Sequence, residues 1–550
     1  MEKRWHVLNQ QEKKVRLDPE TVVAVLLENR KVDDPDSFFN PPKPQSIVSS
    51  FQEFLPDLNE KDLAQAVKRI KKAVAKGEKI VVWGDYDVDG VSSTAILWQT
   101  LFDLGADAMP YIPNRFSEGY GLSRQGIEKL KGEGVSIIVT VDSGITAVEE
   151  VDFANSLGVD VVITDHHLKP KKLPKAHSIV HSTQVCGAGV SWIVASQLGG
   201  SRRKLREALD LVSIATVADL QPLTGVNRSL VRWGFEVLNR LKRPGLAALA
   251  EVSRLKPGTI GSYAAGWVLG PRINAVGRAG EIPGGLELNL EALRLLCTNN
   301  LIKARELAHV LGAANLERKS LTESVSESAR SKVGEQGLIV VYEEGWHEGV
   351  IGLVASRLVE EYGRPAVVIA KGEEFSKGSA RSVNGLNIVD VLRSHEGVLE
   401  DVGGHAAAAG FTVKNEHLDG LVDALRQGTR KLLSTLDLRP VLKVDLELPL
   451  ENLSFDLGFE LERFRPYGVG NPEPLFVARD VDVLSSREVG RDKRHLKLNL
   501  APGFEAIWFG GAKNGSLASG DMVALVYTPG IERWKGKDKV VLKIRDLKRV

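Results

Sequence analysis

The chain has 550 residues, which is more than one hydrophobic core organises, so we expect three or four domains. Its 72 Lys and Arg residues offset 71 Asp and Glu residues, and the net charge of +1 excludes a protein that is basic throughout while it allows a basic groove. The only two cysteines, Cys186 and Cys297, exclude a disulfide framework and a cysteine zinc site.

The N-terminal sequence lacks the apolar core of a signal peptide. No apolar run approaches the roughly 20 residues that span a bilayer. We therefore expect a cytoplasmic protein that does not associate with membranes.

The chain begins with a predicted leader, residues 1–60, that packs on the core. Within it, residues 33–46 are too rich in turn-forming residues for regular structure. An amphipathic helix follows over residues 61–76, with Gly77 as its stop. Short β-branched runs then alternate with helical patterns over residues 79–181, which predicts a buried parallel sheet with helices on both faces.

Acids and imidazoles follow three of these predicted strands. The run "VVWGDYDVDG" is followed by Asp142 after a second strand, and by "DHH" (165–167) after a third. The carboxyl ends of parallel strands line one edge of a sheet, so these groups should converge there. Three acids in a solvated turn would explain the first segment alone equally well, but not the convergence of all three segments.

Several carboxylates at one site need cations, because like charges raise one another's pKa. Carboxylates with one or two imidazoles suit Mn²⁺ or Mg²⁺ better than zinc, and two such ions can clamp a phosphate. In this prediction Asp142 bridges the ions and His167 faces the substrate phosphate as a donor. Asp165 orients an imidazole, and Asp85 is a further candidate at the site. The predicted metal ligands are Asp87, Asp89, Asp142, His166 and Asp219.

Beyond the leader, the sequence predicts four parts. Residues 61–285 form the first α/β domain, in which Asp219 lies near the end of a helix. Residues 286–333 form connecting helices, and residues 334–438 form a second, smaller α/β domain. Residues 439–550 contain short strands separated by Gly and Asp turns, which predicts a small β-barrel.

The motifs "GDYDVDG", "VTVDSG", "TDHH" and "TVADLQPL" resemble those of the DHH phosphoesterase superfamily in its RecJ form, and further motifs such as "WHEGVIGLVASRL", "KGSARS" and "GGHAAAAGF" follow in the same order. The resemblance covers residues 20–550. It implies a parallel-sheet DHH domain, a long linking helix, a smaller α/β DHHA1 domain and a C-terminal OB-type barrel. It also implies degradation of single-stranded DNA from 5′ to 3′ to mononucleotides, in DNA repair and recombination, with two Mn²⁺ or Mg²⁺ ions. The metal ligands carry over onto the five residues listed above.

Two departures from the resembled pattern stand near the site. The chain has "VHSTQ", with His181, where the family usually has Asn-Pro-Asn, and the loop that follows is shorter. Ala215 stands where glycine is common. We expect a change in local loop geometry rather than in the metal site.

Several residues are candidate phosphate ligands. Arg115, Arg272, Arg278 and Arg381 lie among glycines or small residues, where a phosphate can approach closely, and Arg is suited to two phosphate oxygens at once. By resemblance, Arg115, Ser379 and Arg381 hold the terminal 5′ phosphate and His405 contacts the substrate. Internal salt bridges would explain each arginine as well.

The predicted barrel interleaves basic and aromatic residues, as nucleic-acid grooves do. Candidates for strand binding are Arg494, Lys497, Trp508 and Trp534. The alternative is a core of aromatics with a solvated basic edge.

Two rival functions share these features. A DHH enzyme for short oligonucleotides or cyclic dinucleotides would usually lack the barrel, and a non-catalytic scaffold would lose metal ligands. We expect a monomer that binds single-stranded DNA, with a single-strand-binding protein and a helicase as partners implied by the resemblance. The 5′ to 3′ polarity also rests on the resemblance.

Overall fold

The computed structural model describes residues 3–9, 17–114, 118–119, 121–275, 290–335, 337–534 and 537–550. The chain divides into two compact units. Unit 1 comprises residues 55–219 and 234–440, and unit 2 comprises residues 2–54, 220–233 and 441–550.

The first sheet of unit 1 is parallel throughout, as the β-branched runs predict. Its strands are β2 (Lys79–Trp83), β3 (Ala108–Tyr111), β4 (Val135–Val141), β5 (Asp160–Asp165) and β6 (Ser178–His181). They lie in the order β3-β2-β4-β5-β6, so the winding reverses between β2 and β4. In open α/β sheets, ligands bind beyond the carboxyl ends of the strands at such a reversal.

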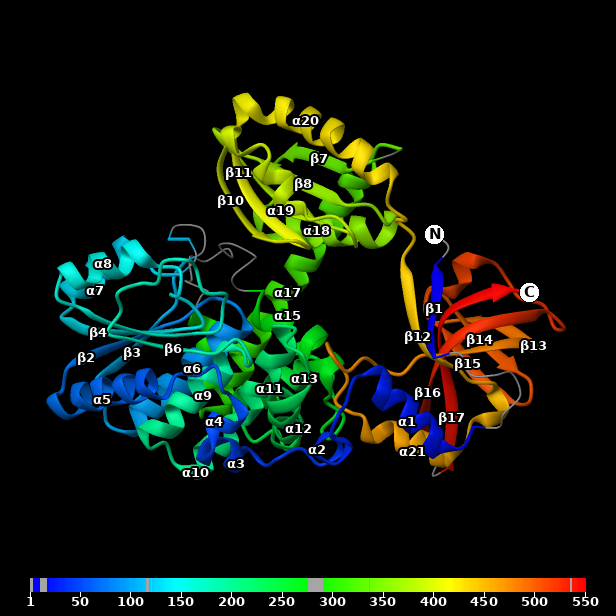
Figure 1. Cartoon of the computed structure of the whole chain (residues 1–550), viewed down its shortest axis with the longest axis horizontal. Helices are drawn as coiled ribbons and strands as arrows, with labels where there is room; N and C mark the ends of the chain where they lie inside the picture. The colour runs from blue at the N-terminus through cyan, green and yellow to red at the C-terminus, as the bar shows by residue number, and fades with distance from the viewer. Residues whose placement is uncertain are drawn as a thin grey trace. The chain divides into compact units, whose positions relative to one another are not determined.

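Helices cover both faces of this sheet. α7 (Arg124–Gly132) and α8 (Val148–Ser156) lie on one face, and α5 (Glu60–Lys76), α6 (Val88–Asp103) and α9 (Gly187–Leu198) lie on the other (Figure 1). α5 confirms the predicted helix. The Asn59 side chain accepts hydrogen bonds from the first-turn amides, and Gly77 ends the helix with a φ of 64°.

The rest of this part of unit 1 is helical. The elements are α10 (Arg202–Glu207), α11 (Leu209–Ala218), α13 (Pro244–Val252), α14 (Ser262–Ala264), the π-helix η1 (Ala265–Leu269), α15 (Gly270–Ile273), α16 (Glu291–Cys297) and α17 (Leu301–Arg330). α16 and α17 confirm the predicted connecting helices. α12 (Gly225–Leu238) begins in unit 2 and ends in unit 1. No helix among the described residues combines the length and apolar character needed to cross a membrane.

A second sheet in unit 1 has the order β10-β11-β9-β8-β7. Its strands are β7 (Ile339–Glu344), β8 (Ala366–Lys371), β9 (Phe375–Arg381), β10 (Leu399–His405) and β11 (Ala408–Lys414). Only β7 and β8 pair in parallel among the described strands of this sheet. Three helices accompany the sheet: α18 (Glu348–Tyr362), α19 (Ile388–Arg393) and α20 (Asn415–Ser434).

Unit 2 is built on a closed barrel, which confirms the predicted OB-type fold. β13 (Phe476–Val489), β14 (His495–Leu500), β15 (Phe504–Trp508), β17 (Lys537–Arg549) and β16 (Met522–Trp534) pair in that order. A β13–β16 pairing closes the ring. Outside it, β12 (Val441–Glu447) pairs in parallel with β1 (Arg4–Asn9). α21 (Phe455–Arg463) belongs to the same unit.

The N-terminal segment contributes helices to unit 2, namely α1 (Pro19–Asn29), α2 (Pro35–Phe39), α3 (Pro44–Ser49) and α4 (Phe51–Phe54). The prediction of no regular structure over residues 33–46 was therefore wrong. Pro35 and Pro44 each occupy the first turn of a short helix, where the missing amide proton costs nothing. Phe38 and Phe39 are buried and pack edge-to-face on Phe464.

Candidate metal centre

The predicted acids and His166 converge at the carboxyl edge of the parallel sheet, where the winding reverses. Asp85, Asp87 and Asp89 follow β2, Asp142 follows β4, and His166 follows β5. Their ligand atoms form three overlapping groups, each with all atoms within 4.8 Å of one another. The groups are Asp85, Asp87 and Asp142; Asp89, His166 and Asp219; and Asp142, His166 and His167.

The turn after β2 is fixed by the capping of α6. Asp87 is the N-cap residue, and its Oδ1 accepts hydrogen bonds from Asp89 N (2.9 Å) and Gly90 N (3.0 Å). Gly90 is needed here, because a Cβ at this position would lie 2.6 Å from the Cβ and the carbonyl oxygen of Asp85. The tight turn brings all three acids to one place.

Asp89 is held by a second helix. Its Oδ2 accepts a hydrogen bond from Gly187 N (2.6 Å) and its Oδ1 accepts one from Ala188 N (2.7 Å). These amides belong to the first turn of α9, where the helix dipole favours a negative charge. The buried Asp89 carboxylate is thereby oriented while it lies 3.6 Å from His166 Nε2.

Asp142 occupies the centre of the cluster. Its backbone is left-handed, with a φ of 59°, and its Oδ1 lies 3.0 Å from His166 Nε2. Burial, followed by the charges of Asp89, Asp87 and Asp85, raises the pKa of this carboxyl well above its usual range. Such an arrangement of oxygen and imidazole donors is chemically suited to hard divalent cations, which would remove the repulsion.

Asp165 fixes the turn that carries the two histidines and contacts the ring of His167. Its Oδ1 accepts a hydrogen bond from His166 N (2.7 Å) and contacts His167 Nδ1 at 2.8 Å, and its Oδ2 accepts one from Ile145 N. Burial alone would lower the pKa of His167, but the hydrogen bond and charge of Asp165 outweigh it and raise that pKa to about 9. His167 is therefore positively charged at neutral pH, and its side chain is partly exposed.

His181, which stands where the sequence departs from the family pattern, supports the turn after β5 that carries His167. Its Nε2 lies 2.7 Å from the carbonyl oxygen of His167. The next two residues are tied to Asp57, which accepts hydrogen bonds from Ser182 Oγ and Thr183 N. Sequence reasoning missed Asp57, because nothing in its own segment marks an anchor that lies 125 residues from its partner.

Asp219 closes the site from the helical side. It caps the C-terminus of α11, as predicted, and its Oδ2 lies 3.9 Å from His166 Nε2. Sequence reasoning also missed Asn274, whose Oδ1 accepts a hydrogen bond from Val88 N (2.7 Å) between the two acids of the α6 turn.

The predicted phosphate ligands are only partly described. Ser379 and Arg381 lie on β9, with Arg381 Nη1 3.1 Å from Ser379 Oγ. A Cβ on Gly352 of α18 would lie 3.0 Å from both side chains. The lack of a side chain at Gly352 therefore leaves space for Ser379 and Arg381. His405 ends β10 and is exposed. Arg115 and Arg278 lie outside the described residues.

The barrel residues predicted to bind the nucleic-acid strand are less suited to that role. Arg494 pairs with Asp492 at 2.8 Å and Lys497 pairs with Glu505 at 3.0 Å. Trp508 is only 9% exposed and packs in the barrel core, which argues against the predicted stacking role. The side chain of Trp534 lies outside the described set.

Sequence reasoning did not separate Trp508 from its neighbour Phe509. Phe509 is 59% exposed and packs edge-to-face on His495. Strand alternation, with its period of two, was the available signal, since adjacent residues point to opposite faces.

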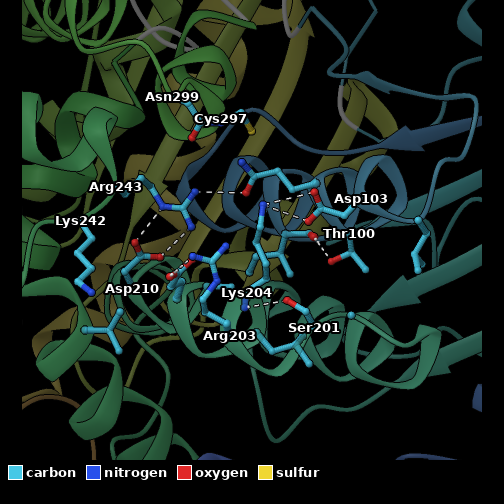
Figure 2. Close-up of a pocket in the computed structure, with 18 of the residues that line it drawn as sticks. Thr100, Asp103, Ser201, Arg203, Lys204, Asp210, Lys242, Arg243, Cys297 and Asn299 are labelled. Carbon is cyan, nitrogen blue, oxygen red and sulfur yellow. Dashed lines mark hydrogen bonds and ion pairs between the residues drawn. The ribbon is translucent and has the colours of Figure 1, made fainter.

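A separate cavity of about 630 Å³ lies near the C-terminal end of α6. Its charged side chains are largely paired with each other: Arg243 with Asp210, Lys204 with Asp103, and Arg203 with Glu207 (Figure 2). No residue of the carboxylate cluster lines it, so it is distinct from the candidate metal centre.

Comparison with known proteins finds family models and relatives that match each of the three sheet-containing parts of the chain. Family models match the DHH family N-terminal domain over residues 79–216, the DHHA1 domain over 335–431 and the RecJ OB domain over 444–546. The chain is 35% identical to the single-stranded-DNA-specific exonuclease RecJ of Bacillus subtilis, over 99% of this chain and 70% of that protein. It is 34% identical to RecJ of Thermus thermophilus, over 89% of this chain and 71% of that protein.

A solved structure agrees with these relatives. The crystal structure of RecJ in complex with Mn²⁺ from Thermus thermophilus matches with a TM-score of 0.83 and 30% identity, covering 99% of this chain and 79% of that one. The chain belongs to the RecJ family of DHH-domain proteins.

Proposed function

We propose that this protein is a single-stranded-DNA-specific exonuclease that hydrolyses phosphodiester bonds with two divalent cations, Mn²⁺ or Mg²⁺. The observation that carries the proposal is the cluster of Asp87, Asp89, Asp142, His166 and Asp219 at one edge of the sheet. The RecJ relatives named above and a family structure that contains Mn²⁺ support it.

The residues divide naturally between two ions. Asp85 and Asp87 would serve one ion, Asp89, His166 and Asp219 would serve the other, and Asp142 would serve both. Bound there, two cations would lower the pKa of a water molecule and stabilise charge on the leaving oxygen.

The protein's own groups complete the chemistry. His167, protonated at neutral pH, would donate a hydrogen bond to a phosphate oxygen, while Asp165 holds its ring. Asp89 is oriented by hydrogen bonds from the α9 amides of Gly187 and Ala188. Ser379 and Arg381 would hold the terminal 5′ phosphate, which would set a 5′ to 3′ direction and release mononucleotides.

Several finer statements belong to the same proposal. We propose the domain limits given in the sequence analysis, a monomer in the cytoplasm, and cooperation with a single-strand-binding protein and a helicase in DNA repair and recombination. The rival scaffold function is disfavoured because every predicted metal ligand is present in the cluster.

The direct test is digestion of end-labelled single strands with Mn²⁺ or Mg²⁺, with and without a 5′ phosphate. The parent should shorten the strand from its 5′ end, faster with the phosphate. Asp142→Asn keeps the shape of the side chain and tolerates the left-handed backbone. It should lower the rate more than about 100-fold, since even outer partners of metal ligands cost 10- to 100-fold, and it should still bind the strand. Digestion by this variant at the parent rate would refute the assignment.

A further inference from the structure

The turn that carries the two histidines lies beyond the end of its sheet. β5 and β6 pair in parallel, and the last pair of their ladder joins Asp165 to His181. His166 and His167 follow that pair, so the ladder does not fix the backbone of either residue. Contacts from outside the ladder therefore decide where these two residues lie.

His181 supplies one such contact through its side chain. Its Nε2 lies 2.7 Å from the carbonyl oxygen of His167, and because a carbonyl only accepts, His181 is the donor. The His181 side chain is buried, and burial lowers its pKa, which leaves the ring neutral at neutral pH. A buried, uncharged ring is thus bonded to the backbone of the turn.

Asp57 anchors the residues that follow β6. Its Oδ1 accepts a hydrogen bond from Ser182 Oγ (2.7 Å), and its Oδ2 accepts bonds from Thr183 N (2.8 Å) and Thr183 Oγ1 (3.1 Å). Asp57 lies between Leu55 and Leu58, which are both buried, so the short segment that presents its carboxylate is itself held by packing.

Ser182 connects this segment back to the histidine turn. Its backbone N donates to the carbonyl oxygen of Asp165 (3.3 Å). The segment reads "VHSTQ" where the RecJ pattern usually has Asn-Pro-Asn, and proline has no amide proton for such a bond. The hydrogen bonds of Asp57, His181 and Ser182 therefore belong to this chain's own sequence. We call Asp57, His181, Ser182 and Thr183 the β6 brace.

His167 depends on this support more than His166 does. The side chain of His166 is 8% exposed and its Nε2 lies 3.0 Å from Asp142 Oδ1, whereas the side chain of His167 is 43% exposed. Packing places a partly exposed ring only in part. The position of the His167 ring therefore also rests on its contact with Asp165 and on the placement of its backbone.

We infer that His181 and Asp57 are positioning residues, which hold the backbone of His167 so that its ring is placed to donate to the substrate phosphate. The inference rests on the proposed exonuclease function, in which His167 contacts the substrate and the β6 brace acts only through it. Loss of the brace should therefore slow turnover while it leaves the binding of metal and strand in place.

The test is steady-state digestion of a 5′-phosphorylated synthetic oligonucleotide with Mn²⁺ by two matched variants. His181→Met and His181→Gln introduce side chains of similar length and shape, but only glutamine carries an N–H donor. His181→Met should lower kcat at least about tenfold, as the loss of an orienting partner does, with KM nearly unchanged. His181→Gln should keep a kcat close to that of the parent, because it retains the donor.

Two controls separate positioning from a general loss of structure. Mn²⁺ affinity in calorimetry should be the same in His181→Met as in the parent. Gln65→Met removes a hydrogen bond of the same kind from the opposite end of β6, where Gln65 Nε2 donates to the carbonyl oxygen of His177 (2.6 Å). This variant should keep the kcat and the KM of the parent.

Asp57→Ala tests the other part of the brace. The Asp57 side chain is exposed, so its truncation leaves no cavity in the core, and kcat should again fall while KM is kept. Combined with His181→Met, the loss in kcat should be smaller than the product of the two single losses, because both residues act on one turn. Asp57→Ala also carries the test if His181→Met does not fold.

The possible failures are distinguishable. If the parent degrades no single strand, the proposed function fails. If the parent is active but His181→Met and Asp57→Ala keep its kcat, only the positioning role is overturned. An equal loss of kcat in His181→Gln and His181→Met, or in Gln65→Met and His181→Met, would overturn it as well.

Discussion

At the residue scale, Asp165 and His167 shift each other's pKa. Asp165 is buried, yet the hydrogen bond and charge of His167 keep its pKa below the usual value once the opposing effect of burial is included. The same contact raises the pKa of His167 to about 9. The pair is therefore a buried carboxylate in contact with a charged imidazole that is partly exposed.

The His167–Asp165 pair predicts a pH dependence of stability in metal-free protein. The pKa of His167 rises from 6.5 in the unfolded chain to about 9 in the folded chain, so its stabilisation is complete below pH 6.5 and is lost as the pH rises through about 9. The difference in thermal midpoint between the parent and His167→Gln, both in EDTA, should be widest at low pH and close above pH 9. A difference that grows with pH would contradict this assignment.

The acids were predictable from sequence because each follows a β-branched run, and the edge of a parallel sheet gathers such positions. The residues that hold these acids in place could not be predicted from the sequence. Asn274 binds Val88 N across 186 residues of chain, and an isolated asparagine carries no local signal of that contact. Trp508 was misjudged because the strands that pair with β15, namely β14 and β17, carry basic residues that resemble a binding face, while the Trp508 side chain packs in the core.

At the scale of elements, the metal centre depends on a close approach between α9 and the turn after β4. A Cβ on Gly187 would lie 2.6 Å from Asp142 Cβ and 2.7 Å from Asp142 Oδ1. The amide of the same glycine binds Asp89. Gly187, which has no side chain, therefore sets the spacing between the two predicted ligands Asp89 and Asp142.

Gly187→Ala should displace the Asp142 carboxylate, destabilise the fold by about 1–3 kcal/mol through overpacking, and weaken Mn²⁺ binding at least tenfold in calorimetry. The control is Gly428→Ala, at an exposed position of α20 where, apart from its chain neighbours and the backbone of its own helix, no described atom lies within 4 Å of the new Cβ. This change should stabilise the protein by roughly 0.5–1 kcal/mol, as alanine does in a helix, and leave metal binding unchanged. Parent-like Mn²⁺ affinity in Gly187→Ala would show that the spacing is not critical.

At the scale of the whole molecule, unit 2 gathers three separated stretches of chain. Arg228, from the middle stretch, donates to the carbonyl oxygens of Phe38 and Phe464, and its guanidinium lies 3.7 Å from the Phe38 ring centroid. Arg30 pairs with Asp445 in a buried contact. Local sequence pattern predicted the barrel strands well, but it contained nothing to assign the first 54 residues to the same unit.

This assembly predicts the result of a truncation. Removing residues 441–550 would expose apolar side chains of the N-terminal segment, including the buried Leu26, Phe38 and Phe39. A patch of this kind is an aggregation hazard. The 1–440 fragment should bind a hydrophobic dye and aggregate in light scattering, and removal of residues 1–54 as well should reduce both effects. A dispersed 1–440 fragment that binds no dye would contradict this.

The most direct test of the central claim is anomalous diffraction from a crystal of this protein grown with Mn²⁺. The account predicts two anomalous peaks within bonding distance of Asp142, one of them also beside His166 and the other beside Asp87. Absence of any peak between these side chains, or peaks confined to other parts of the surface, would contradict it.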